Sequence, residues 1–293
     1  MRFSDIGDQL RAFRLESGLR AEEIAARLGV SRAALYRYEK GEVIKLDTVK
    51  RLAELLKISP LALLGVGIEY YSRPSGFFER LRQVEEISDQ ILQIDGSVCY
   101  LTTGDPFDAA LAEALAEATE SAGAERAQLR AIVDQVLGVQ AARKRAYAQH
   151  RPAVICLLGA GRVEALLQTG VAAGIAASER VRRQCRQAAA AEVARIAEVM
   201  ESEPIGLQFG LLTGIEPAGA FMLLRGRERA SVVVSPFRPD GSPFASTGVA
   251  SVTSAEEALS VHQRVAESLW REALKGPAAA ARLRAMLEAA AER

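Results

Sequence analysis

A chain of 293 residues is too long for one small module, so we expect it to fold into two domains. Its 37 basic and 37 acidic residues balance, which excludes strong non-specific binding to nucleic acid by total charge alone. No apolar stretch approaches the ~20 residues of a membrane span, and Arg2 and Asp5 interrupt any apolar run of a secretory signal. We therefore expect a soluble, cytoplasmic protein with no membrane partner.

The charges are divided unevenly along the chain. Residues 1–65 hold 12 Lys or Arg and 9 Asp or Glu, a net charge of +3, whereas residues 66–293 hold 25 and 28, a net charge of −3. A modest basic excess suits contact with phosphates. If the protein binds nucleic acid at all, its affinity would still have to come from sequence reading and dimerisation.

Three cysteines, Cys99, Cys156 and Cys185, lie far apart in the sequence and form no CxxC pair. Their spacing predicts neither a metal site nor a disulfide, and no cofactor is expected. Buried free thiols are the simplest interpretation. Cys185 is the candidate for a redox-sensing thiol, because three arginines flank it and nearby cations favour the thiolate.

The first predicted helix covers residues 5–17, and its apolar face is made by Ile6, Leu10 and Phe13. The stretch Arg20–Gly41 then predicts two short helices joined by a tight turn. Gly29 ends the first of these, because glycine adopts a left-handed backbone without a Cβ penalty. Ser31 is a good N-cap for the second, since its hydroxyl can accept a hydrogen bond from a free N–H of the first turn. Leu35 and Tyr38 are expected to face inward.

The opposite face of this second short helix carries four residues, Arg32, Ala33, Tyr36 and Arg37. An α-helix fits the major groove of B-DNA, and Arg can bond guanine through two parallel hydrogen bonds. The pattern therefore predicts the recognition helix of a helix-turn-helix. The alternative is a packed helical hairpin whose outer residues are charged without contacting DNA.

Many positions along this part of the chain fit one pattern with almost no gaps. They are Leu10-x-x-x-Arg14, Gly18-Leu19, Glu22-Glu23-Ile24-Ala25, Leu28-Gly29-Val30-Ser31, Leu35, Tyr38-Glu39-x-Gly41 and Leu52-Ala53. On these positions, residues 6–64 resemble the Xre/λ-repressor (Cro/C1-type) helix-turn-helix family. The resemblance implies a sequence-specific DNA-binding domain and covers about a fifth of the chain.

The resemblance also implies roles for individual residues. The side chains of the recognition helix would face bases, and Ser31 would face a phosphate. One departure is Ala21, which stands where the family often has a DNA-contacting Gln. The predicted DNA-binding set is Arg20, Ser31, Arg32, Ala33, Tyr36, Arg37 and Lys40.

Arg14 and Glu39 are a second pair of interest, because residues at these positions pair within related repressors. A buried Arg–carboxylate bond would lock the first helix to the recognition helix. The alternative is that both side chains are only solvated, in which case they contribute little.

Two further helices are predicted before the first domain ends. The first covers residues 47–57, with Asp47 as its cap and a core face made by Val49, Leu52, Ala53 and Leu56. The second covers 59–64 and starts Ser59-Pro60, which places Pro at the first helical position. Residues 1–65 are thus predicted to be an all-α, five-helix, λ-repressor-like domain.

Residues 66–95 are predicted to be a linker and a connector helix. The linker, Gly65–Gly76, is rich in Gly, Pro and Ser. The helix covers 77–94, because six apolar residues follow one another there at spacings of three or four.

The second domain, residues 96–293, mixes short apolar runs with long helical patterns, which argues for an α/β sheet layer covered by helices. The strand candidates are Ser97–Thr102, Ala153–Leu158, Ile205–Leu212, Ala220–Leu224 and Ala230–Val234, with a hairpin turn at Arg225–Arg229. The helix candidates are Pro106–Ser121, Ala124–Gln149, Ser178–Glu201, Ser254–Lys275 and Ala278–Glu292.

Signs of catalysis in the second domain are weak. The Gly-rich segment Leu157–Arg162 follows a strand, but Glu164 breaks the phosphate-loop pattern, which favours a plain strand-to-helix turn. From Ala220 onward, AFMLLRGRERASVVVSPF and the later Leu269-Trp270 loosely resemble degenerate phospholipase-D-like sensor domains of bacterial and archaeal regulators. Active members of that fold need a His with Lys two residues on, and neither His150 nor His262 has it. We therefore expect no enzyme.

A domain that binds a small molecule and biases a DNA-binding homodimer fits the sequence best. Candidate effector-binding residues lie on or next to the predicted strands: Tyr100, Thr102, Thr103, Gln208 and Phe209. Two alternatives stay open, namely an enzyme with a DNA-binding arm and a protein-interaction module without a pocket.

Overall fold

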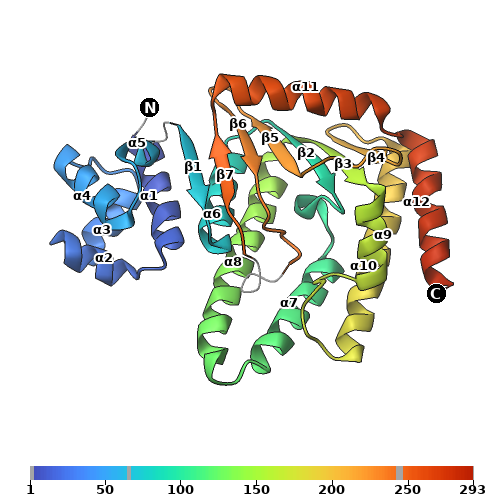
Figure 1. The fold of residues 1–293 in the computed structure, drawn as a ribbon, viewed down its shortest axis with the longest axis horizontal. Coiled ribbons are helices and arrows are strands. Elements are labelled where there is room, and N and C mark those ends of the chain that lie inside the picture. The colour runs from blue at the N-terminus through green and yellow to red at the C-terminus, as the bar shows by residue number, and fades with distance from the viewer. Residues whose placement is uncertain (1–2, 65–66, 242–246, 293) are drawn as a thin grey trace.

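The computed structural model describes residues 3–64, 67–241 and 247–292. Residues 3–64 form a helical lobe, and the remaining described residues form a larger sheet body beside it (Figure 1). The predicted layout, an all-α domain followed by an α/β domain, is confirmed. None of the helices in the described ranges combines the length and hydropathy that a membrane crossing requires.

The helical lobe holds five helices around one apolar core: α1 (Phe3–Ser17), α2 (Ala21–Leu28), α3 (Arg32–Glu39), α4 (Leu46–Leu56) and α5 (Pro60–Leu63). Each helix contributes a fully buried aliphatic side chain, in order Leu10, Ile24, Leu35, Leu52 and Leu63. Because the apolar stripes recur every three or four residues, each short helix can bury one face against the others. The five-helix prediction is confirmed.

Helix α4 differs from its prediction at one end. Lys45 is its N-cap, so the predicted cap at Asp47 is wrong, and Asp47 lies in the first turn instead. A carboxylate there still interacts favourably with the positive end of the helix dipole. The α5 prediction holds, because Ser59 accepts a hydrogen bond from the Leu61 amide at 3.2 Å and Pro60 is the first helical residue.

The sheet body is built on seven strands in the spatial order β1-β7-β6-β5-β2-β3-β4. Strands β2, β3 and β4 are parallel, and the other neighbouring pairs are antiparallel. The strands are β1 (Ile68–Tyr71), β2 (Gln90–Gly96), β3 (Ala153–Gly159), β4 (Leu207–Leu212), β5 (Phe221–Arg225), β6 (Ala230–Val234) and β7 (Ala250–Thr253).

Helices cover both faces of this sheet. On one face lie α6 (Pro74–Glu86), α7 (Asp105–Glu120), α8 (Arg126–His150), α9 (Ala160–Thr169) and α10 (Glu179–Ser202), with α12 (Gly276–Ala291) packed against α9 and α10. On the other lies α11 (Glu256–Glu272) (Figure 1). Successive residues of β3 point to opposite sides, so that Cys156 and Leu158 join the first core and Leu157 joins the second. The predicted helix-covered sheet is confirmed.

The connection between lobe and body is itself part of the sheet. β1 pairs antiparallel with β7, and α6 begins at Pro74. The predicted linker is therefore wrong for residues 68–71 and 74–76, which belong to β1 and α6, while residues 65–66 lie outside the described residues. The Gly and Pro residues that suggested a loop mark element ends instead, since Gly67 precedes β1 and Pro74 occupies the first turn of α6.

The predicted connector helix over 77–94 is wrong in its second half. Helix α6 ends at Glu86, Ile87 is exposed, and β2 begins at Gln90. β2 pairs with β3 on one side and with β5 on the other. A central strand buried on both faces has closely spaced apolar residues, and a short run of these is hard to distinguish from a helical stripe.

One strand prediction fails, and two strands besides β2 were missed. Ser97–Thr102 is not a strand, because residues 97 and 98 form a bend and a 3₁₀ turn, η1 (Tyr100–Thr102), follows with Cys99 as its N-cap. These two strands, β1 and β7, are four residues each, and they pair with one another although they lie far apart in the sequence. The Arg225–Arg229 turn is confirmed, since the Gly226 amide donates to the Arg229 carbonyl at 2.9 Å.

Buried hydrogen bonds join α1 to the sheet body. The Glu69 carboxylate, on β1 and only 2% exposed, accepts hydrogen bonds from Gln9 Nε2 (2.7 Å), from the Tyr71 hydroxyl (2.8 Å) and from Arg80 Nε (2.6 Å) and Nη2 (2.9 Å). Burial, with the Glu69 charge nearby, raises the pKa of Tyr71 well above its ordinary value. Gln9 belongs to α1 and Arg80 to α6, so one carboxylate fixes three elements together.

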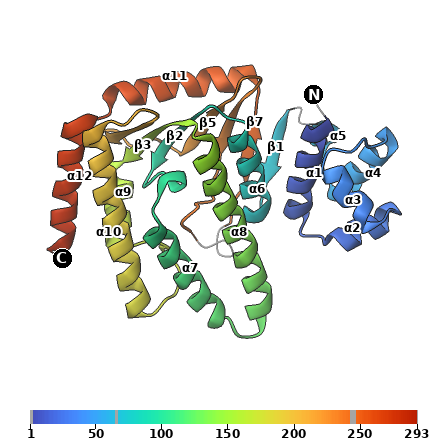
Figure 2. The ribbon, with the colours of Figure 1, turned by 180° about the vertical axis from the view of Figure 1, so that it is seen from behind.

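The last turn of α1 is held as well. Glu16 accepts hydrogen bonds from the Ser72 amide and hydroxyl, both at 2.7 Å, and from the Arg73 amide at 3.0 Å. The Phe13 ring stacks on the Tyr71 ring with centroids 5.4 Å apart. The lobe is thus fastened along the length of α1, which lies against α6 and β1 in both views (Figure 2).

Candidate nucleic-acid interface

Helices α2 and α3 have the geometry that the sequence predicts. Gly29 follows α2 in the left-handed conformation, with φ of 70°, which L side chains rarely adopt. Ser31 is the N-cap of α3, and its hydroxyl accepts a hydrogen bond from the Ala34 amide at 3.1 Å. Leu35 is fully buried and Tyr38 is half-buried, as expected for the inner face of α3.

Helix α1 positions α3 from behind. Gly7 lies so close to the end of α3 that a Cβ there would come within 2.7 Å of the Tyr38 and Glu39 carbonyl oxygens. Beside it, Arg14 donates from Nε and Nη2 to the two oxygens of Glu39, at 2.5 and 3.1 Å. The predicted pair is therefore formed, and both side chains are mostly buried. Burial disfavours the charged guanidinium, but the bonds to Glu39 outweigh that effect and raise the pKa of Arg14.

Helix α3 lies on the side of α1 that is away from the sheet body (Figures 1 and 2). The Arg32 and Arg37 side chains are 59% and 62% exposed, and Ala33 is exposed between them. The Tyr36 ring lies within 5.3 Å of the Arg32 guanidinium and 5.9 Å of the Arg14 guanidinium. Tyr36 thus connects the buried pair to the exposed surface.

The exposed arginines already have acidic neighbours, which the sequence reasoning missed. Arg32 Nη1 lies 2.8 Å from Glu22, and Arg37 Nε lies 3.4 Å from Glu42. The Tyr36 hydroxyl and Glu22 together raise the pKa of Arg32, the hydrogen bond from Arg32 to Tyr36 being the larger cause. The i,i+5 spacing of Arg37 and Glu42 gave no clear helical signal, since α3 ends at Glu39.

The two remaining cations of the predicted set lie at helix ends and are exposed. Arg20 is the N-cap of α2, where its side chain pairs with Glu23 at 3.0 Å and its amide donates to the same carboxylate. Lys40 is the C-cap of α3. The structure therefore brings all seven predicted DNA-binding residues onto α2, α3 and their caps.

The predicted effector residues are not brought together. Tyr100 lines a cavity in the sheet body, but Thr102, Thr103, Gln208 and Phe209 do not. Thr103 is occupied, since its hydroxyl donates to the Tyr100 carbonyl and accepts from Lys144. On β4, Gln208 is exposed and Phe209 is buried in the core. The strand that was predicted to carry Tyr100 and Thr102 is absent, because these residues form the 3₁₀ turn η1.

The cavity has a volume of about 560 Å³, and its lining residues come mainly from α6, from the carboxyl end of β2 and from the β5–β6 pair with the segment after β6. It holds two acidic and three basic side chains among mostly apolar ones. The Gly-rich segment after β3 lies near it but forms only a strand-to-helix turn, because α9 begins at Ala160 directly after β3, as predicted.

The remaining groups of interest are the candidate metal ligands and the three cysteine thiols. Within the described ranges, no group of three or more His, Cys, Asp or Glu could hold a metal ion. All three cysteines are buried free thiols. Burial raises the pKa of Cys185, which disfavours the thiolate that a redox sensor needs. A hydrogen bond with the Cys156 thiol lowers the pKa of Cys99, whereas burial raises that of Cys156.

Known proteins resemble parts of this chain. A family described as a helix-turn-helix domain matches residues 5–64. A Pyrococcus horikoshii protein provisionally named an HTH-type transcriptional regulatory protein is 33% identical over 110 residues, which make up 35% of this chain and 33% of that protein. The chain thus matches about a third of that relative's length.

A more distant likeness is to the structure of TrmBL2, an archaeal chromatin protein whose structure was described as showing a novel mode of DNA binding. It has a TM-score of 0.32 and 12% identity and covers 78% of this chain and 62% of that one. A likeness at this level demonstrates neither a common fold nor a common function. The family match and the geometry of α2 and α3 agree, and residues 5–64 of this chain are a helix-turn-helix domain.

Proposed function

We propose that the protein is a sequence-specific, DNA-binding transcriptional regulator of the Xre type that acts in the cytoplasm as a homodimer. The single observation that carries this proposal is the outer face of α3. It presents two long, exposed guanidinium groups from a helix whose other face is locked into the lobe by Leu35 and by the Arg14–Glu39 pair.

The geometry of α3 supports docking into the major groove. Arg32 and Arg37 can reach base edges or phosphates, and the small Ala33 allows close approach of the helix. Both arginines are paired with exposed carboxylates, and such pairs contribute little free energy. DNA phosphates and guanine edges can therefore replace Glu22 and Glu42 at low cost.

A homodimer is proposed because one module of this size buries too little surface for specific binding. Two-fold symmetry would place two α3 helices about one DNA turn apart, ~34 Å, on a near-palindromic operator. Residues 1–65 carry a net charge of only +3, so charge alone is a weak source of affinity and the helical lobe of a second subunit is needed.

The sheet body is proposed to bind a small-molecule effector. A ligand changes DNA affinity only if it binds the DNA-competent and DNA-incompetent arrangements unequally. Helix α6 offers the physical connection, because Phe77, Phe78 and Leu81 line the cavity while Arg80 bonds Glu69 beside α1. A shift of α6 on ligand binding would therefore be felt by the helix that positions α3.

The cavity also favours this version over a pure protein-interaction module, which needs no ligand-sized hollow. An enzymatic role has no comparable support. Neither histidine lines the cavity, and His262 contacts the Ala258 carbonyl and the Phe221 ring instead. We propose a non-catalytic sensor.

The test is binding-site selection from random duplex DNA with the full chain, followed by footprinting. Arg32→Ala and Arg37→Ala are expected to lose the selected operator, with dimer mass and melting temperature nearly unchanged. Arg183→Ala, which removes an exposed arginine on α10, serves as the matched control. Wild-type affinity and the same footprint in both α3 variants would refute the proposed docking.

A further inference from the structure

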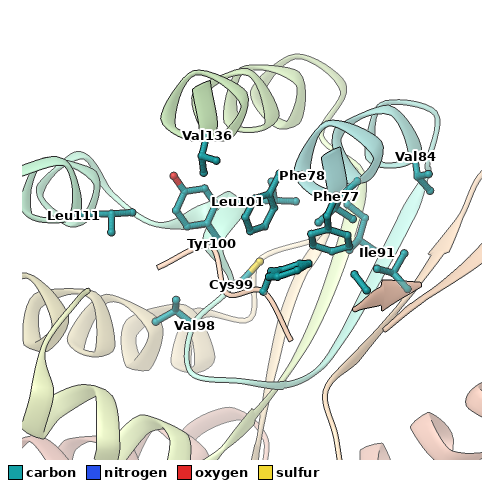
Figure 3. Close-up of a cluster of buried hydrophobic side chains, with 14 of the residues drawn as sticks. Phe77, Phe78, Val84, Ile91, Val98, Cys99, Tyr100, Leu101, Leu111 and Val136 are labelled. Carbon is teal, nitrogen blue, oxygen red and sulfur yellow. The ribbon is translucent and has the colours of Figure 1, made fainter. Parts of the chain in front are cut away.

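The sheet body contains a hollow of a size that suits a small ligand. Its volume of about 560 Å³ lies within the 300–1,000 Å³ range typical of ligand pockets. Most of its walls are apolar, made by Phe77, Phe78, Leu81, Ile91, Phe221 and Phe237. Figure 3 shows Phe77 and Phe78 reaching from α6 toward Cys99 and Tyr100. An occupant would bury hydrocarbon against these rings.

The cavity lining also includes charged side chains, and the two carboxylates among them already have partners. Asp95 Oδ2 accepts from Arg162 Nε and Nη2 at 3.1 and 3.0 Å. Asp240 accepts from Arg238 Nε and Nη2 at 3.0 and 2.7 Å. Both carboxylates are buried, whereas about half of each guanidinium side chain is exposed. The accessible charge is therefore positive.

Both lining arginines, Arg162 and Arg238, keep an unused N–H donor group. Among the described residues, neither Arg162 Nη1 nor Arg238 Nη1 has a hydrogen-bond partner, although both side chains line the hollow. Arg238 is further held by Ser97, whose hydroxyl lies 3.4 Å from Nη2. Two oriented guanidinium groups with spare N–H donors match the acceptor oxygens of a carboxylate.

The backbone around Asp95 is built for this arrangement. Asp95 has φ of 61°, at the point where the register of β2 against β3 shifts between Ile94 and Gly96. A Cβ on Gly159, at the end of the neighbouring strand β3, would lie only 2.5 Å from Asp95 Oδ1. Residues held in sparsely populated backbone regions occur preferentially at ligand sites. Here the irregular backbone turns a carboxylate toward Arg162 and so orients that guanidinium.

We infer that this cavity binds a small organic carboxylate with an apolar body, its anionic group held by Arg162 and Arg238 and its hydrocarbon by the phenylalanines. The regulatory consequence, a change in DNA affinity, rests on the function proposed above, whereas the binding itself does not. A neutral analogue loses the charge-assisted hydrogen bonds, and a short anion such as acetate loses the contact with the apolar walls.

The experiment measures heats of binding to the full chain without DNA. The probes are 3-phenylpropanoate and octanoate, with 3-phenylpropanamide and acetate as the matched controls. We expect saturable binding of at least one of the two acids, and at least about tenfold weaker binding of the amide and of acetate. Saturable binding of neither acid, or equal binding of 3-phenylpropanoate and its amide, overturns the inference.

Variants then locate the site. The double variant Arg162→Gln, Arg238→Gln should abolish the preference for acid over amide. Leu81→Trp should weaken the binding of both the acid and the amide, because the larger side chain fills the cavity. Arg183→Gln on α10 should change nothing. Survival of the full preference in the double variant overturns the assignment of the two arginines, and the wild-type comparison stands even if that variant is poorly folded. Arg32→Ala should bind the acid normally, so a failure of DNA binding and a failure of ligand binding are separable.

Discussion

Arginine–carboxylate pairs occur in two contrasting settings, on the outer face of the helical lobe and at the junction between lobe and body. On the lobe, Arg32–Glu22 and Arg37–Glu42 are more than half exposed. At the junction, Arg80–Glu69 is almost completely buried. An exposed pair stabilises the folded protein by at most about 1 kcal/mol. Breaking a buried pair is costlier, because it leaves one charge unpaired in a low-dielectric site. The exposed arginines can give up their carboxylate partners for DNA groups at low cost. The buried pair holds the helical lobe in a fixed position on the sheet body.

The largest effect is expected from Glu69→Gln. This change leaves the buried Arg80 guanidinium without a counter-charge, and it should cost about 3–5 kcal/mol of unfolding free energy. Urea denaturation of the full chain measures it. A loss of less than about 1 kcal/mol would mean that the junction pair behaves like a surface pair, and the contrast between the two settings would fail.

The next effect is expected from Arg14→Ala. It removes the pair with Glu39 that joins α1 to α3, and it should destabilise the protein by about 3 kcal/mol. Operator affinity should fall as well, because α3 loses its positioning contact. Differential scanning calorimetry and a gel shift measure the two effects. Arg27→Ala, at an exposed arginine in the last turn of α2, is the control and should leave stability nearly unchanged. Wild-type stability in Arg14→Ala would show that the Arg14–Glu39 pair does not stabilise the fold.

A smaller effect, of opposite sign for binding, is expected from Glu22→Gln. The exposed pair with Arg32 is lost at a cost below about 0.5 kcal/mol, and DNA affinity should rise because no carboxylate competes with phosphate. A salt titration of the gel shift measures this gain, which should be largest at low ionic strength. Glu54→Gln, at an exposed position on α4, controls for the change in net charge. Weaker binding in Glu22→Gln would indicate that Glu22 positions Arg32 for DNA.

The smallest effect concerns Asp8, on α1 at the junction. Burial raises the pKa of its carboxyl above the ordinary value of 3.8, despite the opposing charges of Arg82 and Arg80. The folded protein therefore favours protonated Asp8, and this contribution to stability is lost as pH rises through the raised pKa. Asp8→Asn should show a melting temperature that gains on the wild type as pH rises above 3.8. A constant difference across that range would contradict the raised pKa.

The helical lobe was predictable because its determinants are local. Gly29, Ser31 and Leu35 each fix the backbone or the burial of their own short segment, and α2 and α3 follow directly. The pairing of Arg14 with Glu39 came from the family resemblance, since a separation of 25 residues carries no periodic signal.

The sheet body was harder because its determinants are distant. β1 is a strand only because Ile68–Tyr71 meets Ala250–Thr253 from the far end of the sequence. β2 was predicted as helix because Ile91 and Ile94 continue the spacing of α6. The cavity could not be predicted, because Arg162 and Arg238 reach it from separate elements and only the folded sheet places them together.

The contacts that hold α1 against the sheet body have a consequence for the choice of operator. Helix α5 ends at Leu63 and β1 begins at Ile68, while Glu16 and Gln9 bind groups of residues 69–73 directly. These contacts therefore prevent the helical lobe from rotating independently of the sheet body. In the proposed dimer, the contact between the two sheet bodies would therefore set the distance between the two α3 helices. The dimer would bind operators with one spacing between half-sites and would bind operators with altered spacing much more weakly.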